Sequence, residues 1–201
     1  MSAGRTPSHS PFEVRTERLL LRRWLPDDRP PFAAMNADPE VMRYFPAPLT
    51  QSESDALASR ADASFEEHGF GLWALELRES REFLGFTGLA PMPDGFGGVE
   101  VGWRLARAFW GAGYATEAAR ASIRVAFDTL GLDEVSSVTA VVNERSQAVM
   151  RRLGMVSVEH FDSPRVPAGS PLVPHVRYAL AAPSTSAGAP YGVSRVGPRN
   201  R

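Results

Sequence analysis

The alternation of apolar and polar residues along this chain predicts a sheet of six to seven strands. The strands are expected at residues 17–24, 70–78, 82–89, 98–105, 135–142, 155–161 and 172–180. The clearest pattern is that of residues 98–105, where apolar side chains occupy every odd position and glycine, glutamate or arginine every even one. A period of two residues is the signature of a strand with one buried face. The link at 79–81 is short enough to make a hairpin of its two neighbouring strands.

Helices are predicted between these strands. Residues 26–45 are interrupted by three prolines, so two short helices fit better than one, the second beginning at Asp38 before Pro39. Residues 50–68 form a longer helix, with a capping box made by Thr50 and Glu53 and a stop at Gly69. Two further helices are expected at residues 116–130 and 144–153, each followed by a glycine.

This order of elements predicts one α/β (α+β) domain at residues 14–182, with a mixed, mostly antiparallel sheet flanked by helices. Residues 1–13 are expected to be a flexible tail. Residues 183–201 are rich in proline, glycine and serine and bury too little apolar surface to offset the entropy of ordering. We therefore expect a disordered C-terminal tail.

Composition excludes several classes of function. The formal net charge of -1, from 22 basic and 23 acidic side chains, gives no broad basic surface for nucleic acid. The chain contains no cysteine, and its four histidines lack the spacing of metal ligands, so no metal site is expected. Apolar runs are shorter than the roughly 20 residues that span a bilayer. With no apolar signal-peptide core near the N-terminus, we expect a cytoplasmic protein without a membrane partner.

The segment FWGAGYATEA, residues 109–118, joins a predicted strand to a predicted helix. A Gly-x-Gly turn that opens a helix offers unpaired N–H groups and the positive end of the helix dipole, which together favour a phosphate ligand. A dinucleotide-binding Rossmann turn would require glycine or alanine where Thr116 stands, and the Gly-Lys-Ser/Thr of a Walker A loop is absent. A plain strand-to-helix turn remains the alternative.

The order of elements and three segments resemble the Gcn5-related N-acetyltransferase (GNAT) superfamily, within it the RimJ/RimL-like branch. The segments are TERLLLRRW, the glycine turn and NERSQAVMRRLGM, and the resemblance covers about residues 14–181. The family's Q/R-x-x-G-x-G/A signature falls on residues 110–115, with Trp110 in place of the usual glutamine or arginine. The resemblance implies an acetyl-CoA site made by Trp103, Leu105, Trp110, Gly111, Ala112, Gly113, Tyr114, Ala115, Thr116, Asn143 and Ser146.

The same resemblance suggests two catalytic residues. Glu100 is the only carboxylate inside its strand and is the candidate base that takes a proton from the amine, against the alternative of a solvent-facing glutamate. Many relatives carry a tyrosine acid where Met150 stands, so Ser146, or a water that it orients, becomes the leading candidate acid, ahead of Tyr114. Asn143 is expected to cap the helix that it precedes and, by resemblance, to contact the pantetheine arm.

Two functions follow as hypotheses. The first is an acetyl-CoA-dependent N-acetyltransferase, a monomer or homodimer, that moves the acetyl group to a primary amine of a small molecule or a protein N-terminus. Transfer would be direct within a ternary complex, since no cysteine exists to carry the acetyl group. The second is a non-catalytic acyl-CoA-binding or regulatory module, a reading that the missing tyrosine keeps open.

Overall fold

The computed structural model describes residues 13–92 and 96–183, so the tails predicted at 1–13 and 183–201 fall almost wholly outside the described residues. Within the described part, one sheet contains eight strands in the order β1-β2-β3-β4-β5-β6-β8-β7. The strands are β1 (Val14–Arg15), β2 (Leu19–Arg22), β3 (Leu72–Leu77), β4 (Phe83–Pro91), β5 (Val99–Leu105), β6 (Glu134–Ala140), β7 (Val156–Asp162) and β8 (Pro174–Ala181).

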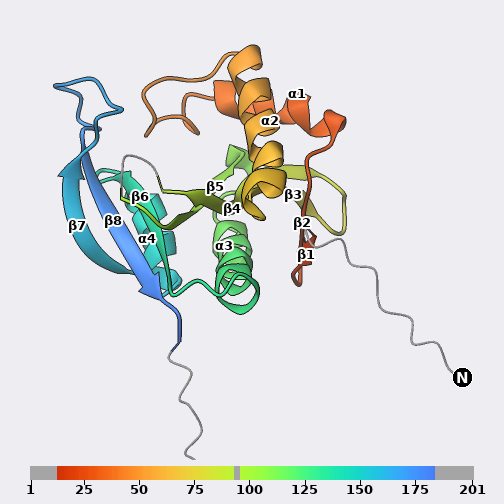
Figure 1. Cartoon of the computed structure of the whole chain (residues 1–201). Coiled ribbons are helices and arrows are strands. Elements are labelled where there is room, and N and C mark those ends of the chain that lie inside the picture. The colour runs from red at the N-terminus through yellow and green to blue at the C-terminus, as the bar shows by residue number, and fades with distance from the viewer. Residues whose placement is uncertain (1–12, 93–95, 184–201) are drawn as a thin grey trace, which may run out of the picture.

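The α-helices are α1 (Arg29–Ala37), α2 (Gln51–His68), α3 (Tyr114–Arg124) and α4 (Glu144–Arg152). Short 3-10 turns precede α1 (η1, Pro26–Asp28) and α3 (η2, Arg107–Phe109), and a π-helical turn (η3, Val125–Thr129) extends α3. Helices α1 and α2 lie on one side of the sheet and α3 on the other (Figure 1). No helix in the described ranges is long and apolar enough to cross a bilayer.

The predicted class is confirmed: only β5 and β6 pair in parallel among the described strands, and all other pairs are antiparallel. The eighth strand is β1, two residues long, which pairs with β2 just inside the predicted start of the domain. The capping box of α2 is present as predicted, with the Glu53 N–H donating to Thr50 Oγ1 and the Thr50 N–H donating to Glu53 Oε2.

The prediction of a second short helix beginning at Asp38 is wrong. Residues 39–47 form turns, and the Asp38 carboxylate accepts the Glu40 N–H at 2.8 Å in a local turn. Pro46 and Pro48 follow, and proline cannot supply the N–H groups that a continuing helix needs. Pro30 and Pro31 fall instead in the first turn of α1, where a missing N–H costs no helical hydrogen bond.

The two faces of β5 serve different purposes. The odd residues Val101 and Leu105 are buried in the main core together with residues of α3. The even residue Arg104 contacts Asn36 of α1 and Phe86 of β4, which places the even face on the side of α1 and α2. Glu100 and Gly102 share that face, because side chains alternate along a strand.

The sheet opens between β5 and β6. Strand β5 is paired with β4 at seven positions from Val99 to Leu105, whereas its parallel pairing with β6 is confined to Glu100 and Ser136 among the described residues. The Ala106 N–H donates to Leu84 O, which fixes the even residues of β5 as those bonded to β4. The bridge at Glu100 uses the backbone of Val99 and the Val101 N–H, so the Val101 carbonyl and the backbone groups of Trp103 are the ones that face the opening.

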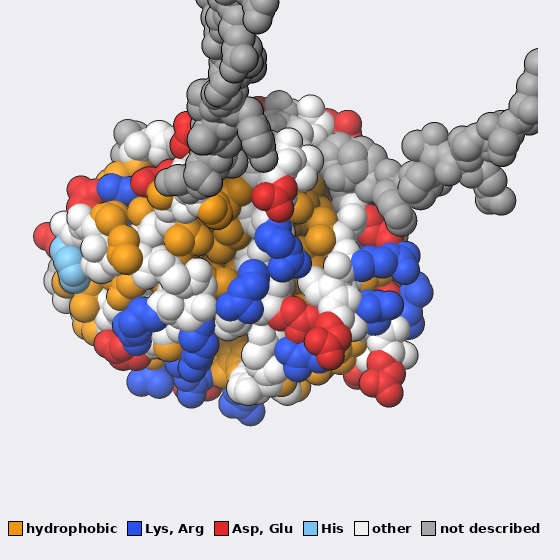
Figure 2. Space-filling model, turned by 90° about the horizontal axis from the view of Figure 1, so that it is seen from below, with side chains coloured by type: hydrophobic (Ala, Val, Ile, Leu, Met, Phe, Trp, Pro, Cys, Tyr) orange, Lys and Arg blue, Asp and Glu red, His pale blue; other side chains and the backbone are white. Residues whose placement is uncertain are grey.

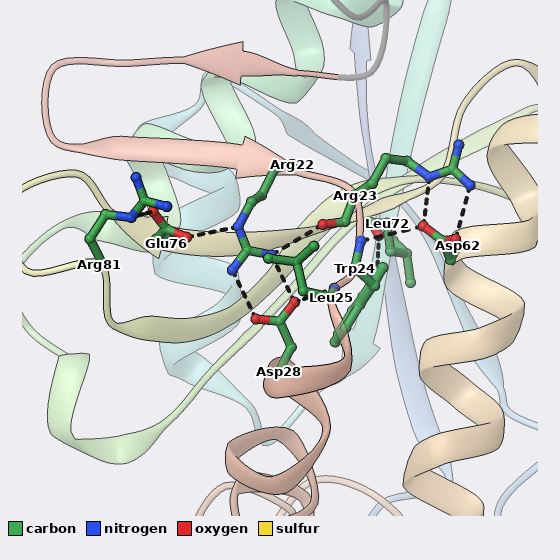
Figure 3. Close-up of polar contacts among 9 residues, drawn as sticks. All are labelled: Arg22, Arg23, Trp24, Leu25, Asp28, Asp62, Leu72, Glu76 and Arg81. Carbon is green, nitrogen blue, oxygen red and sulfur yellow. Dashed lines mark hydrogen bonds and ion pairs between the residues drawn. The ribbon is translucent and has the colours of Figure 1, made fainter.

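A buried charge network ties β2 and β3 to η1 (Figure 3). Arg22 donates twice to the carboxylate of Asp28, at 2.7 and 2.8 Å, and once to Glu76 at 2.8 Å. The side chains of Asp28 and Glu76 are only 4% and 3% exposed. Arg81 Nε lies 2.6 Å from the other oxygen of Glu76, as an ion contact whose angle is not that of a hydrogen bond. The bond to Asp28 is the largest cause that raises the pKa of Arg22 above its ordinary value.

Candidate functional site

The glycine turn leads from η2 into α3 and carries a run of unsatisfied N–H groups. Gly111 and Gly113 have φ of 81° and 84°, a left-handed conformation that glycine adopts without strain. Within the described structure, no backbone acceptor pairs with the N–H groups of residues 111–116, six in succession. The backbone N–H of Trp110, a residue of the acetyl-CoA site implied by the resemblance, donates to Arg107 O at 3.2 Å. The set of available donors thus begins at Gly111.

Arg18 and Glu117 fasten this turn to the edge of the sheet. Arg18 Nη1 donates to Ala112 O at 2.9 Å, and the Arg18 guanidinium forms an ion pair with Glu117 at 2.7 Å. Thr16 Oγ1 also donates to Glu117, at 2.6 Å. Burial would raise the pKa of Glu117, but these hydrogen bonds outweigh it and lower the pKa. Glu117 therefore fixes the start of α3.

A hollow of about 510 Å³ lies beside the turn and is lined in part by Gly113 and Thr116. Four arginines contribute to its walls: Arg18, Arg120, Arg124 and Arg152. Figure 2 views the molecule from the side on which α3 lies and shows basic side chains spread over this face, with acidic ones among them. The surroundings of the turn are therefore rich in cations, as expected for a phosphate site.

Trp110 packs back against the sheet. Its indole N–H donates to the carbonyl oxygen of Leu105 at 2.8 Å, and the Arg145 guanidinium lies 4.8 Å from its ring centroid. The indole N–H is therefore not directed at a ligand, and the Leu105 carbonyl already accepts one hydrogen bond. Arg145 lies in the first turn of α4, and its guanidinium places a positive charge beside Trp110 at the start of the glycine turn.

Glu100 lies where β5 and β6 part. Its Oε1 accepts the Val138 N–H of β6 at 3.3 Å, so the side chain supplies the acceptor that a continuous β5 would have given. Burial raises the pKa of Glu100 to about 7, against the opposing effects of the Val138 N–H and the positive charge of Arg165. The half-buried position does not match the alternative of a solvent-facing strand glutamate. A carboxylate with a pKa near 7 can exchange protons at neutral pH.

Asn143 immediately precedes α4, and Ser146 lies in its first turn. The side-chain oxygen of Asn143 accepts the Ser146 N–H at 3.2 Å, so the predicted cap is present. Asn143 Nδ2 donates to Thr139 Oγ1 at 2.9 Å, which ties the cap to β6. The Ser146 hydroxyl has no hydrogen-bond partner among the described residues and is half-exposed, whereas Met150 is fully buried. Tyr114 lies under Arg18, whose guanidinium is 4.5 Å from its ring centroid.

Three arginines near these residues were missed from the sequence: Arg18, Arg104 and Arg145. Arg145 belongs to the NERSQ segment and Arg18 to the opening strand segment, so both lay inside motifs that sequence reasoning had already singled out. Their roles depend on which elements pack together, and a single sequence does not give that. The described residues contain no group of three or more His, Cys, Asp or Glu side chains that could hold a metal ion.

Comparison with known proteins identifies the family. The acetyltransferase (GNAT) domain family matches residues 18–156. The chain is 37% identical over 137 residues to the FsC-acetyl coenzyme A-N(2)-transacetylase of Aspergillus fumigatus, an alignment that covers 63% of this chain and 57% of that protein. The chain thus spans little more than half the length of this relative.

Solved structures have the same fold. An acetyltransferase from Agrobacterium tumefaciens, 28% identical, superposes with a TM-score of 0.72 over 90% of this chain and 100% of the other. The spermidine N-acetyltransferase of Vibrio cholerae, solved in complex with CoA and spermine, has a TM-score of 0.67 over 83% of this chain and 96% of the other, at 18% identity.

Proposed function

This chain belongs to the GNAT family of acetyltransferases, and we propose that it transfers the acetyl group of acetyl-CoA directly to a primary amine in the opening between β5 and β6. The observation that carries the proposal is the position of Glu100, a carboxylate of raised pKa at the point where the two strands part.

The donor site is proposed from the groups that lack partners. The N–H groups of residues 111–116, at the positive end of the α3 dipole, suit the pyrophosphate of CoA. The Val101 carbonyl and the backbone groups of Trp103 can pair with the amides of the pantetheine arm as a missing strand would. Leu105, Tyr114 and Asn143 border this path. Arg145 adds a positive charge beside the turn.

In the proposed reaction, Glu100 accepts a proton from the acceptor ammonium, directly or through a water. The neutral amine then attacks the thioester carbonyl carbon, and a carbon–nitrogen bond forms as the carbonyl becomes a tetrahedral oxyanion. Collapse of this intermediate breaks the carbon–sulfur bond. The leaving thiolate takes a proton from the Ser146 hydroxyl or from a water that it orients. The attacking nitrogen gives up its remaining extra proton, which restores that hydroxyl or water, and Glu100 returns its proton to solvent. The products are the amide and free CoA.

The acceptor is proposed from the RimJ/RimL-like signature, which favours a protein N-terminal amine over a small-molecule amine. The ring of Phe96, shortly before β5, lies 4.9 Å between centroids from the ring of Phe161 in β7. Loop shape determines which acceptor fits, so the family signature transfers the chemistry better than the substrate. A cytoplasmic location remains a prediction.

The proposal is tested by free-thiol release from acetyl-CoA with a panel of peptides and small amines, and by mass spectrometry of the acceptor. We expect thiol release that depends on the amine, with one acetyl group gained by the acceptor and none by the enzyme. Tight CoA binding without turnover on any acceptor would instead support the non-catalytic module, the reading that Met150 in place of the tyrosine keeps open.

Replacing Gly111 by alanine is expected to raise the KM for acetyl-CoA by at least about tenfold, because a Cβ and a strained left-handed residue would disturb the pyrophosphate contact. The matched control is Gly131→Ala at the end of η3. Both glycines have positive φ, 81° and 65°, and a Cβ at either meets no atom within 4 Å. Equal effects of the two variants on the KM for acetyl-CoA would show that Gly111 is needed only for its backbone conformation and not for contact with CoA.

Replacing Ser146 by alanine is expected to lower kcat by about 10²-fold with little change in the KM for acetyl-CoA, since a general acid acts on the leaving thiolate. The α4 cap is retained because it uses the Ser146 backbone N–H. Ser52→Ala, in the first turn of α2, serves as the control for serine removal. Unchanged kcat in Ser146→Ala would assign the proton to another donor.

A further inference from the structure

Arg104 is a half-buried cation on the even face of β5 that has no carboxylate partner among the described residues. Burying a guanidinium without an anion is unfavourable. Burial accordingly lowers the pKa of Arg104 to about 10, which still leaves it charged at neutral pH. By contrast, the network around Arg22 supplies two carboxylates for a comparable buried cation. The absence of a carboxylate beside Arg104 within the described structure suggests that its anion comes from a ligand.

Neutral groups hold the guanidinium in place. Its Nη1 donates to Asn36 Oδ1 at 2.7 Å, and the fully buried Asn36 donates in turn to Ser54 Oγ at 2.8 Å. The ring centroids of Phe45 and Phe86 lie 4.0 and 5.5 Å from the guanidinium carbon of Arg104. Nε is buried and has no acceptor among the described residues. Nη2 also has no partner among the described residues, but it is accessible to solvent. The head group is therefore fixed, and its Nη2 is available to a ligand.

The Arg104 side chain, with its available Nη2, lies on the same face of β5 as Glu100. Gly102 lies between the two residues, and a Cβ at Gly102 would meet no atom within 4 Å, so the space above it is open. Gly102 pairs with Gly88 of β4, so the neighbouring position has no side chain either. Four residues of strand separate the Cα atoms of Glu100 and Arg104 by about 13 Å. The even face thus offers an open strip with a base at one end and a cation at the other.

We propose that Arg104 binds a carboxylate of the acceptor. The acceptor lies between the two side chains, so the preferred substrates carry an anionic group roughly 10 Å from the amine that Glu100 deprotonates, somewhat less than the Cα separation along the strand. This inference rests on the proposed function and adds the substrate class. The free Nη2 can donate a charge-assisted hydrogen bond to a carboxylate, and the bond is strengthened in a half-buried site. A polyamine would place a second cation against Arg104 and would be disfavoured.

Oligoglycines test the spacing, because each extended residue adds about 3.3–3.6 Å between amine and carboxylate. Glycine, diglycine, triglycine and tetraglycine are compared with their C-terminal amides as acceptors. We expect the free acid to exceed the amide in kcat/KM by about 10- to 100-fold for triglycine, the range of a hydrogen bond to a charged group. Equal kcat/KM for acids and amides at every length would overturn the proposal.

Three variants locate the effect. Arg104→Gln should abolish the preference for the acid while the KM for acetyl-CoA is unchanged, and Arg104→Lys should retain part of it. Arg43→Gln removes the same charge from the neighbouring α1–α2 segment, where the Arg43 side chain is 62% exposed, and should keep the full preference. Loss of the preference in Arg43→Gln to the same degree would reduce the effect to general electrostatics and overturn the proposal.

A measurement without turnover separates this inference from the proposed function. The Arg104 Nε–H resonance, assigned by its absence in Arg104→Gln, is followed by ¹⁵N NMR of the CoA-bound protein. Triglycine is expected to shift it and triglycine amide to leave it in place. A shift without any acetylated product would uphold the carboxylate site and refute the acetyl transfer, whereas no shift with triglycine would refute the carboxylate site.

Discussion

Glu100→Gln is expected to lower kcat by about 10²- to 10⁴-fold at neutral pH while the KM for acetyl-CoA stays unchanged, the loss typical of a removed general base. The glutamine side-chain oxygen can still accept the Val138 N–H, so the opening between β5 and β6 keeps its shape. The donor groups proposed for CoA lie on residues 111–116 and on the backbone edge of β5, which this change leaves intact. Steady-state kinetics with saturating acceptor measures the two constants separately.

Glu134→Gln is the matched control, because Glu134 lies at the start of β6 and its side chain is 55% exposed. Unfolding in urea provides the second control. The pKa of Glu100 is raised to about 7 in the folded protein from about 4.3 in an unfolded chain, so its contribution to stability is complete below about pH 4.3 and is lost as pH rises through 7. Glu100→Gln should therefore be at least as stable as the wild type at pH 8. A fall in kcat shared by Glu134→Gln would contradict the assignment.

Arg22→Met is expected to lower the free energy of unfolding by about 3–5 kcal/mol, the cost of leaving buried charges unpaired. Asp28 would keep only the Leu25 N–H as a close partner, and Glu76 would keep Arg81, a side chain that is 75% exposed. Methionine preserves most of the volume, so the loss reports charge more than packing. Urea unfolding at pH 7, followed by circular dichroism, gives the value.

The control for this change is Arg15→Met, on β1. Arg15 is 62% exposed and pairs with Glu13, so its removal should cost less than about 1 kcal/mol. If Arg22→Met lowered the free energy of unfolding no more than Arg15→Met, the network of Figure 3 would not be a main source of stability for β2 and β3.

Local signals account for the parts of the fold that the sequence predicted. The capping box of α2, the glycine after it and the alternation in β5 each depend on neighbouring residues, and each is present. The wrong helix after Asp38 shows the limit of such signals, because an acidic cap and a proline also suit a turn. The two residues of β1 are too few to show a periodic pattern.

The candidate site was only partly predictable, for the same reason. The glycine turn and the Asn143 cap are local and were anticipated from their residues. The separation of β5 from β6 depends on pairs that do not form, which no single strand encodes. Arg104 shows neither a motif nor a spacing, and its lack of an acid becomes visible only when α1, β4 and β5 are packed together.

The dependence of kcat/KM on pH, in the wild type and in Glu100→Gln with the same acceptor, tests the central claim most directly. A base must be ionised to accept a proton, so the wild-type value should rise with pH through an inflection near 7, the pKa to which burial raises Glu100. The variant should lack this inflection and rise only as the acceptor amine itself loses its proton. An inflection near 7 that persists unchanged in Glu100→Gln would contradict the account.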